Sequence, residues 1–143
     1  MKKGLIFVVI LVTLFLSGCS WQISKTAYDD LITKLEKMDY QVTEKDEKKE
    51  FLQGERKKLT LNKNVKIWVY LYESKEKMEE DAACIQPGGY GYDNGRNAVD
   101  VEWVLPPHFF KAENMIVLYV GENLDLINAL REIVSEPFAE STE

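Results

Sequence analysis

Residues 59–72 read Leu-Thr-Leu-Asn-Lys-Asn-Val-Lys-Ile-Trp-Val-Tyr-Leu-Tyr, and the expected architecture of the chain follows from this stretch. Aliphatic side chains alternate along it with polar or aromatic ones, a spacing that is typical of β-strands. The polar residues Asn62-Lys63-Asn64 interrupt the alternation, and asparagine favours tight turns. The stretch therefore predicts two antiparallel strands, Leu59–Leu61 and Val65–Tyr72, joined by a turn.

The longer of these strands has two different faces. One face is aliphatic and consists of Val65, Ile67, Val69 and Leu71. The other face carries Lys66 and three aromatic residues, Trp68, Tyr70 and Tyr72. If no helix covers the aromatic face, its rings form a surface large enough to bind a partner. The alternative is that the rings pack against loops or against Trp103, since aromatic pairs also stabilise open sheets.

Outside the hairpin, the periodicity of the sequence predicts helices at 26–38, 75–85 and 124–134 and strands at 98–104 and 115–120. The charged run at 44–50 is expected to be a solvated loop. The resulting order, α-β-β-α-β-β-α, predicts an α+β fold with two layers. In this fold an antiparallel β-sheet is covered by helices packed on one face.

A glycine-rich loop at 87–97 contains two further aromatic candidates, Tyr90 and Tyr92. Glycine lets the backbone approach a ligand closely, and tyrosine rings can stack on one. The loop does not match the dinucleotide-binding fingerprint. We predict Tyr90 and Tyr92 to be partner-binding residues, and the alternative is a mobile connection between elements.

Few residues indicate catalysis. His108 is the only histidine, which excludes HExxH and other multi-histidine zinc sites. The sequence contains neither a P-loop nor the Gly-x-Ser-x-Gly turn of serine hydrolases. We therefore expect no metal and no cofactor. The acidic group Glu79-Glu80-Asp81 is expected to be a solvated helix face, because adjacent helical residues point in different directions.

The 143-residue chain has 18 basic and 24 acidic residues, which gives a net charge of −6. Binding to nucleic acid relies on a basic surface that neutralises phosphates. The charge therefore argues against nucleic acid as a partner.

The N-terminus carries the most specific signal in the sequence. Met1-Lys2-Lys3 is a short basic start, and an apolar run from Gly4 to Leu16 follows it. This pattern is typical of a secretory signal, and the run is short for a spanning helix, which needs about 20 apolar residues. The exit sequence Leu16-Ser17-Gly18-Cys19 resembles the lipobox of bacterial lipoprotein precursors.

This resemblance implies cleavage between Gly18 and Cys19 and a diacylglyceryl group on the Cys19 thiol. Two acyl chains hold a protein stably at a membrane. The chain would then consist of a signal peptide at 1–18, a lipidated tether at 19–25 and one α+β domain at 26–143. Loss of Lys2 and Lys3 changes the net charge from −6 to −8. The domain itself is similar to small lipoproteins without an assigned role.

These observations predict a lipid-anchored protein on the extracytoplasmic face of the cell membrane. We expect a non-enzymatic binding or interaction module, with the membrane as one partner and a protein or small ligand as the other. The alternative is a small cell-envelope hydrolase or transferase that uses His108 as a general base.

Overall fold

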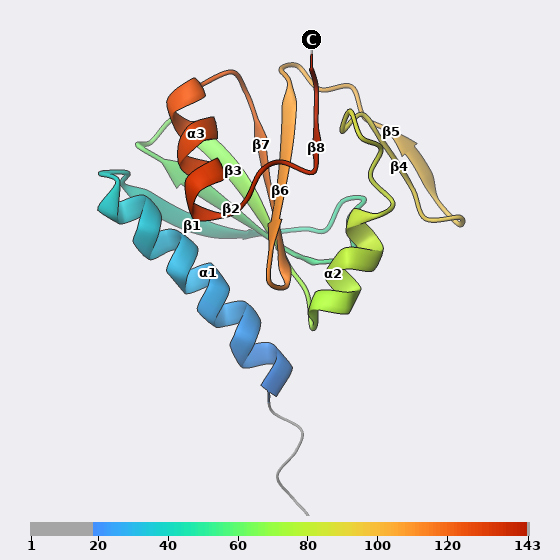
Figure 1. The fold of residues 1–143 in the computed structure, drawn as a ribbon, viewed down its shortest axis with the longest axis horizontal. Helices are drawn as coiled ribbons and strands as arrows, with labels where there is room; N and C mark the ends of the chain where they lie inside the picture. The colour runs from blue at the N-terminus through green and yellow to red at the C-terminus, as the bar shows by residue number, and fades with distance from the viewer. Residues whose placement is uncertain (1–18, 143) are drawn as a thin grey trace, which may run out of the picture.

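The hairpin predicted at residues 59–72 lies inside a six-stranded antiparallel sheet (Figure 1). The computed structural model describes residues 19–142, and residues 19–25 by their backbone only. Strand β2 (Glu55–Leu61) pairs with β3 (Val65–Leu71). Asn62 and Lys63 between them have φ angles of 49° and 69°, the left-handed conformation of a tight hairpin turn.

The sheet order is β1-β2-β3-β7-β6-β8, and β4 and β5 pair with each other outside this sheet. The remaining strands are β1 (Val42–Glu47), β4 (Gly91–Asp93), β5 (Ala98–Asp100), β6 (Pro107–Ala112), β7 (Met115–Val120) and β8 (Ala139–Glu140). The helices are α1 (Cys19–Lys37), α2 (Lys75–Ala82) and α3 (Leu124–Ile133). The α+β class, the antiparallel sheet and the packing of helices on the sheet agree with the prediction.

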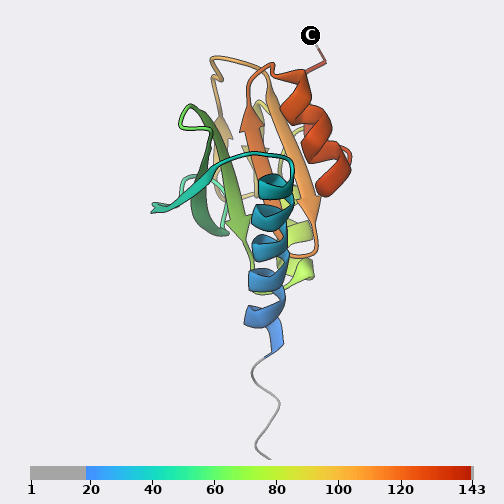
Figure 2. The ribbon, with the colours of Figure 1, turned by 90° about the vertical axis from the view of Figure 1, so that its left-hand side faces the viewer.

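One face of the sheet is covered by α1 and α3 (Figure 2). The aliphatic side chains of β3 point to this face, where Ile67 and Val69 are fully buried. Leu31 and Leu35 of α1 pack there, together with Leu126, Ile127 and Leu130 of α3. The side chain of Asn123 accepts hydrogen bonds from the backbone N–H groups of Asp125 and Leu126, which caps the start of α3.

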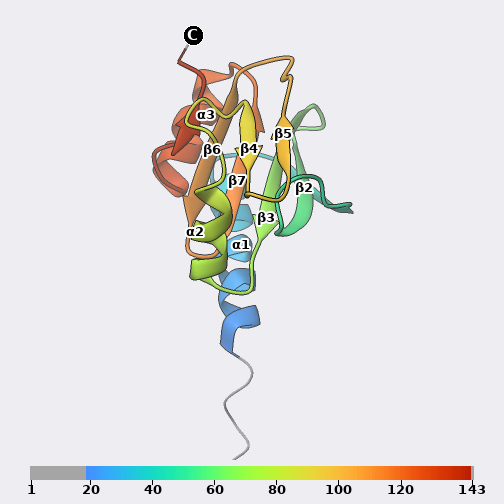
Figure 3. The same cartoon turned by 90° about the vertical axis from the view of Figure 1, so that its right-hand side faces the viewer.

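The opposite face is covered as well, by α2 and the β4–β5 hairpin (Figure 3). Met78 and Ala82 of α2 pack with Tyr70, Phe109 and other residues in a second buried cluster. The prediction that helices lie on one face only is therefore wrong. The second face of β3, β6 and β7 is also rich in large apolar side chains, and these need their own cover.

Two local predictions of secondary structure are also wrong. The charged run at 44–50 was predicted to be a loop, but residues 44–47 belong to β1. Asp46 pairs with Lys57 of β2 at 2.7 Å and Glu47 pairs with Lys58 at 2.5 Å, so opposite charges stabilise this edge of the sheet. Residues 98–104 do not form a long strand, because β5 ends at Asp100.

The β4–β5 hairpin lies partly in the predicted 87–97 loop. Its turn is closed by side chains: Asp93 accepts a hydrogen bond from the Gly95 backbone N–H, and Asn94 accepts bonds from the N–H groups of Arg96 and Asn97. Gly95 has a φ angle of 80°, which glycine adopts without strain.

At the N-terminus, residues 19–25, which we assign to the tether, continue α1 as helix. The signal peptide predicted at 1–18 lies outside the described residues, as does Gly18 of the predicted cleavage site.

The two-sided core predicts a specific pair of stability effects. Phe109 and Phe110 are neighbours in β6, both are fully buried, and their rings enter opposite cores. We expect Phe109→Ala and Phe110→Ala each to lower the free energy of unfolding by about 3–5 kcal/mol, measured by urea denaturation. Lys66→Ala, at an exposed position of β3, serves as the control and should change it by less than about 0.5 kcal/mol. A near-neutral Phe109→Ala would contradict a covered second face.

Candidate functional site

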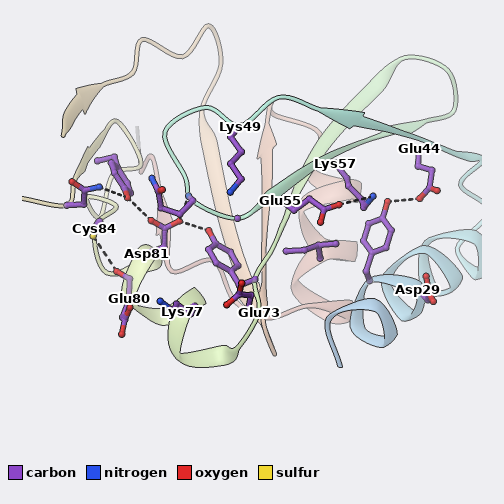
Figure 4. A pocket seen from close by; sticks show the side chains of 17 residues that line it. Asp29, Glu44, Lys49, Glu55, Lys57, Glu73, Lys77, Glu80, Asp81 and Cys84 are labelled. Carbon is purple, nitrogen blue, oxygen red and sulfur yellow. Dashed lines mark hydrogen bonds and ion pairs between the residues drawn. The ribbon is translucent and has the colours of Figure 1, made fainter. Parts of the chain in front are cut away.

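A cavity of about 870 Å³ lies at the end of the sheet where β2 begins and β3 ends. Tyr28 and Asp29 of α1 form its wall on one side (Figure 4). Residues of α2 and β4 form the wall on the other side, and the segment 49–55 passes between the two. Binding sites for small molecules typically measure about 300–1,000 Å³, so this cavity is large enough for one.

The buried carboxylate of Asp81 organises the α2 end of the cavity. Its side chain accepts hydrogen bonds from the Tyr72 hydroxyl at 2.7 Å, the Tyr92 hydroxyl at 2.6 Å and the Gln53 backbone N–H at 2.7 Å. Asp81 is only 5% exposed. These bonds connect α2 to the end of β3, to β4 and to the loop before β2. All the partners are donors, and an ionised carboxylate, which only accepts, fits this arrangement.

Gly54 allows the loop to pass directly over the Tyr72 ring. A Cβ atom added at this position would lie 2.9 Å from the Tyr72 ring and 3.0 Å from the Tyr70 Cβ. Real Cβ atoms do not come so close to other heavy atoms, so a larger residue would push the loop away. The glycine therefore brings the Gln53 N–H within reach of Asp81.

The protonation of the tyrosines matches their role as donors. Burial raises the pKa of Tyr92 to about 12, and the hydrogen bond to Asp81 adds to this effect. The same two causes, in the same order, raise the pKa of Tyr72. Burial and the Asp81 and Asp93 carboxylates raise the pKa of the Cys84 thiol, whose S–H donates to the Glu80 carbonyl oxygen. Cys84 is therefore a weak nucleophile at neutral pH.

Charges of both signs line the rest of the cavity. Lys57 is paired with Asp46 at 2.7 Å and with Glu55 at 3.4 Å. Lys49 and Lys77 make no ion pair within the part of the chain that the structure describes, and Figure 4 shows them on opposite sides of the cavity. Glu73 and Glu80 also line the cavity.

The three aromatic residues predicted on one face of β3 do share that face, but they do not form an open surface. Tyr70 is 0% exposed and Tyr72 is 6% exposed, because the second cover of the sheet lies over them. The half-buried Trp68 donates from its indole N–H to Glu47 at 3.2 Å, and the Arg56 guanidinium lies 5.5 Å from its ring centroid. We predicted that Trp68, Tyr70 and Tyr72 could form an exposed docking face, and the burial of Tyr70 and Tyr72 contradicts this prediction.

The residues predicted in the glycine-rich loop separate into two environments. Tyr92 is buried and lines the cavity through its bond to Asp81. Tyr90 is exposed and does not line the cavity. Of the predicted binding residues, the structure thus places Tyr72 and Tyr92 in the cavity lining and leaves Trp68, Tyr70 and Tyr90 outside it.

His108 lies in β6, outside the cavity lining. It is 7% exposed, its Nε2 is 3.0 Å from the Gly121 carbonyl oxygen, and its Nδ1 is 3.0 Å from a Glu140 carboxylate oxygen. Its ring also stacks on Tyr119. Both nitrogens are occupied by acceptors that connect β6 to β8 and to the end of β7. This geometry favours a structural role for His108.

The prediction missed Asp81, which is buried although Glu79-Glu80-Asp81 was expected to be a solvated face. The spacing Met78, Asp81, Ala82 places it on the apolar side of α2, which is the signal that could have identified it. Within residues 19–142, no three His, Cys, Asp or Glu side chains group as a metal ion would require. None of the described helices is long and apolar enough to cross a bilayer.

Comparison with protein-family models, with curated proteins and with solved structures finds no match to this chain.

The role of Asp81 is tested by Asp81→Ala. The substitution leaves two buried tyrosine hydroxyls and the Gln53 N–H without their acceptor, and we expect the free energy of unfolding to fall by about 2–4 kcal/mol in urea denaturation. Glu76→Ala, on the exposed side of the same helix, is the control and should have an effect below about 0.5 kcal/mol. Equal effects of the two substitutions would show that the carboxylate does not hold α2 in place.

Proposed function

We propose that this chain is a lipid-anchored, extracytoplasmic binding protein and that its ligand binds in the cavity between α1 and α2. The lipobox-like sequence at Leu16–Cys19 supports the anchor. The cavity supports binding, since its size fits a small ligand and its wall combines aromatic rings with charged groups.

The observation that carries the proposal is the position of the cavity relative to α1. Tyr28 and Asp29 form one wall of the cavity, and α1 extends from there past the end of the sheet toward Cys19 (Figure 1). A helix rises about 1.5 Å per residue, so Cys19 lies about 14 Å along the axis from Tyr28. A lipid on Cys19 would therefore hold the cavity close to the membrane surface.

The charge of the domain is consistent with a ligand that is bound above the lipid headgroups. After removal of residues 1–18, the net charge is −8, which an anionic leaflet repels within a Debye length of about 8 Å. The domain is then held by its acyl chains alone, and the cavity stays open to molecules at the cell surface.

The anchor is tested by intact-mass analysis of the protein extracted from membranes. We expect the chain to begin at Cys19 and to carry the mass of a diacylglyceryl group, because two acyl chains are needed for stable attachment. Cys19→Ala should remain unprocessed and lack the lipid, whereas Cys84→Ser should be lipidated like the original chain. A free thiol at Cys19 in the mature protein would disprove the anchor.

The binding site is tested by photo-crosslinking in intact cells. A benzophenone amino acid placed at position 73 lies on the cavity wall, whereas one at position 75 is exposed two residues further along the chain and lies outside the lining. We expect an adduct of defined mass at position 73 and none at position 75, detected by mass spectrometry of the purified protein. Equal labelling at both positions, or none at 73, would contradict a ligand in this cavity.

A further inference from the structure

We propose that the cavity binds a small zwitterion, with its ammonium group at Asp81 and its carboxylate between Lys49 and Lys77. The proposal rests on the binding function above and specifies the chemistry of the ligand. The class that fits is a short peptide with free termini.

The first argument is that the Asp81 carboxylate has no cationic partner. It is 5% exposed and accepts hydrogen bonds from Tyr72, Tyr92 and the Gln53 N–H, all of them neutral groups. No ion pair to Asp81 is formed by any described residue. A buried charge is costly unless an opposite charge compensates it. A carboxylate has about four lone-pair positions, so one remains for a further donor beside the three that are used.

The surroundings of Asp81 also favour an ammonium group. Tyr72 and Tyr92 line the same end of the cavity, and the Tyr72 hydroxyl oxygen, whose proton is donated to Asp81, can also accept a hydrogen bond from an ammonium group. Glu80 also lines the cavity and brings a second negative charge to this end. A positive ligand group is therefore stabilised at the α2 end.

The second argument concerns the two free lysines. Lys57 is already neutralised by Asp46 and Glu55, but among the described residues neither Lys49 nor Lys77 has an anionic partner. Lys49 lies on the segment before β2 and Lys77 on α2, so their ammonium groups reach the cavity from different elements (Figure 4). An anionic group in the cavity is therefore attracted by two positive charges, and either ammonium group can donate a charge-assisted hydrogen bond to it.

The spacing of these groups sets the size of the ligand. Lys77 and Asp81 are four residues apart on the same side of α2, which is about 6 Å along the axis. An extended peptide advances about 3.5 Å per residue, so the two termini of a dipeptide can bridge these groups. A cavity of about 870 Å³ also accepts somewhat longer peptides. A simple anion or a simple cation would leave one of the two sites unused.

The test is calorimetric titration of the mature, lipidated protein in detergent with three probes: dialanine, N-acetyl-dialanine and dialanine amide. We expect dialanine to bind and each blocked form to bind about tenfold more weakly, because each lacks one charge. Lys77→Gln should weaken dialanine several-fold and leave the affinity of dialanine amide unchanged. Glu80→Gln should weaken dialanine and leave N-acetyl-dialanine unchanged.

Lys75→Gln and Glu76→Gln are the matched controls, since both residues are exposed on α2 outside the cavity lining, and both should bind dialanine like the original protein. Equal affinity for the three probes, no detectable binding of dialanine at millimolar concentration, or equal effects of Lys77→Gln and Lys75→Gln would overturn the proposal. A position-73 adduct in cells together with no dialanine binding would reject the zwitterion and retain the binding function.

Discussion

The structure depends on one constraint, which is that the central strands bury side chains on both faces of the sheet. In β3, Ile67 and Val69 enter one core while Tyr70 enters the other, and β7 alternates in the same way. A strand of this kind is stable only between two layers. Helices α1 and α3 supply one layer, and α2 with the β4–β5 hairpin supplies the other.

The second layer is the smaller one, and polar contacts help to hold it. The Asp81 carboxylate joins α2, β3, β4 and the loop before β2 through three hydrogen bonds. The cavity lies where this layer and α1 approach each other at the end of the sheet. The site and the second core are therefore parts of the same arrangement, because the residues that close the core also form the wall of the cavity.

Several expectations failed for one common reason, which is that the partner of a segment cannot be inferred from its own pattern. The aromatic face of β3 was correctly defined, but residues far away in the chain cover it. The run at 44–50 has the composition of a loop, yet residues 44–47 form an edge strand because Lys57 and Lys58 lie opposite. Asp81 is a partial exception, because the spacing within α2 indicates its burial, but its three donors come from other elements and cannot be inferred from that spacing.

What the sequence determined by itself was local: the hairpin at 59–72, the three helices, the α+β class and the lipobox-like signal. Each of these depends on residues that are close in the chain, where periodicity and turn chemistry act directly. The tertiary structure decided which surfaces are covered, where the charges meet and that Tyr72 and Tyr92 share one carboxylate. Those outcomes depend on contacts between distant segments, which exist only after the sheet has formed and been covered on both sides.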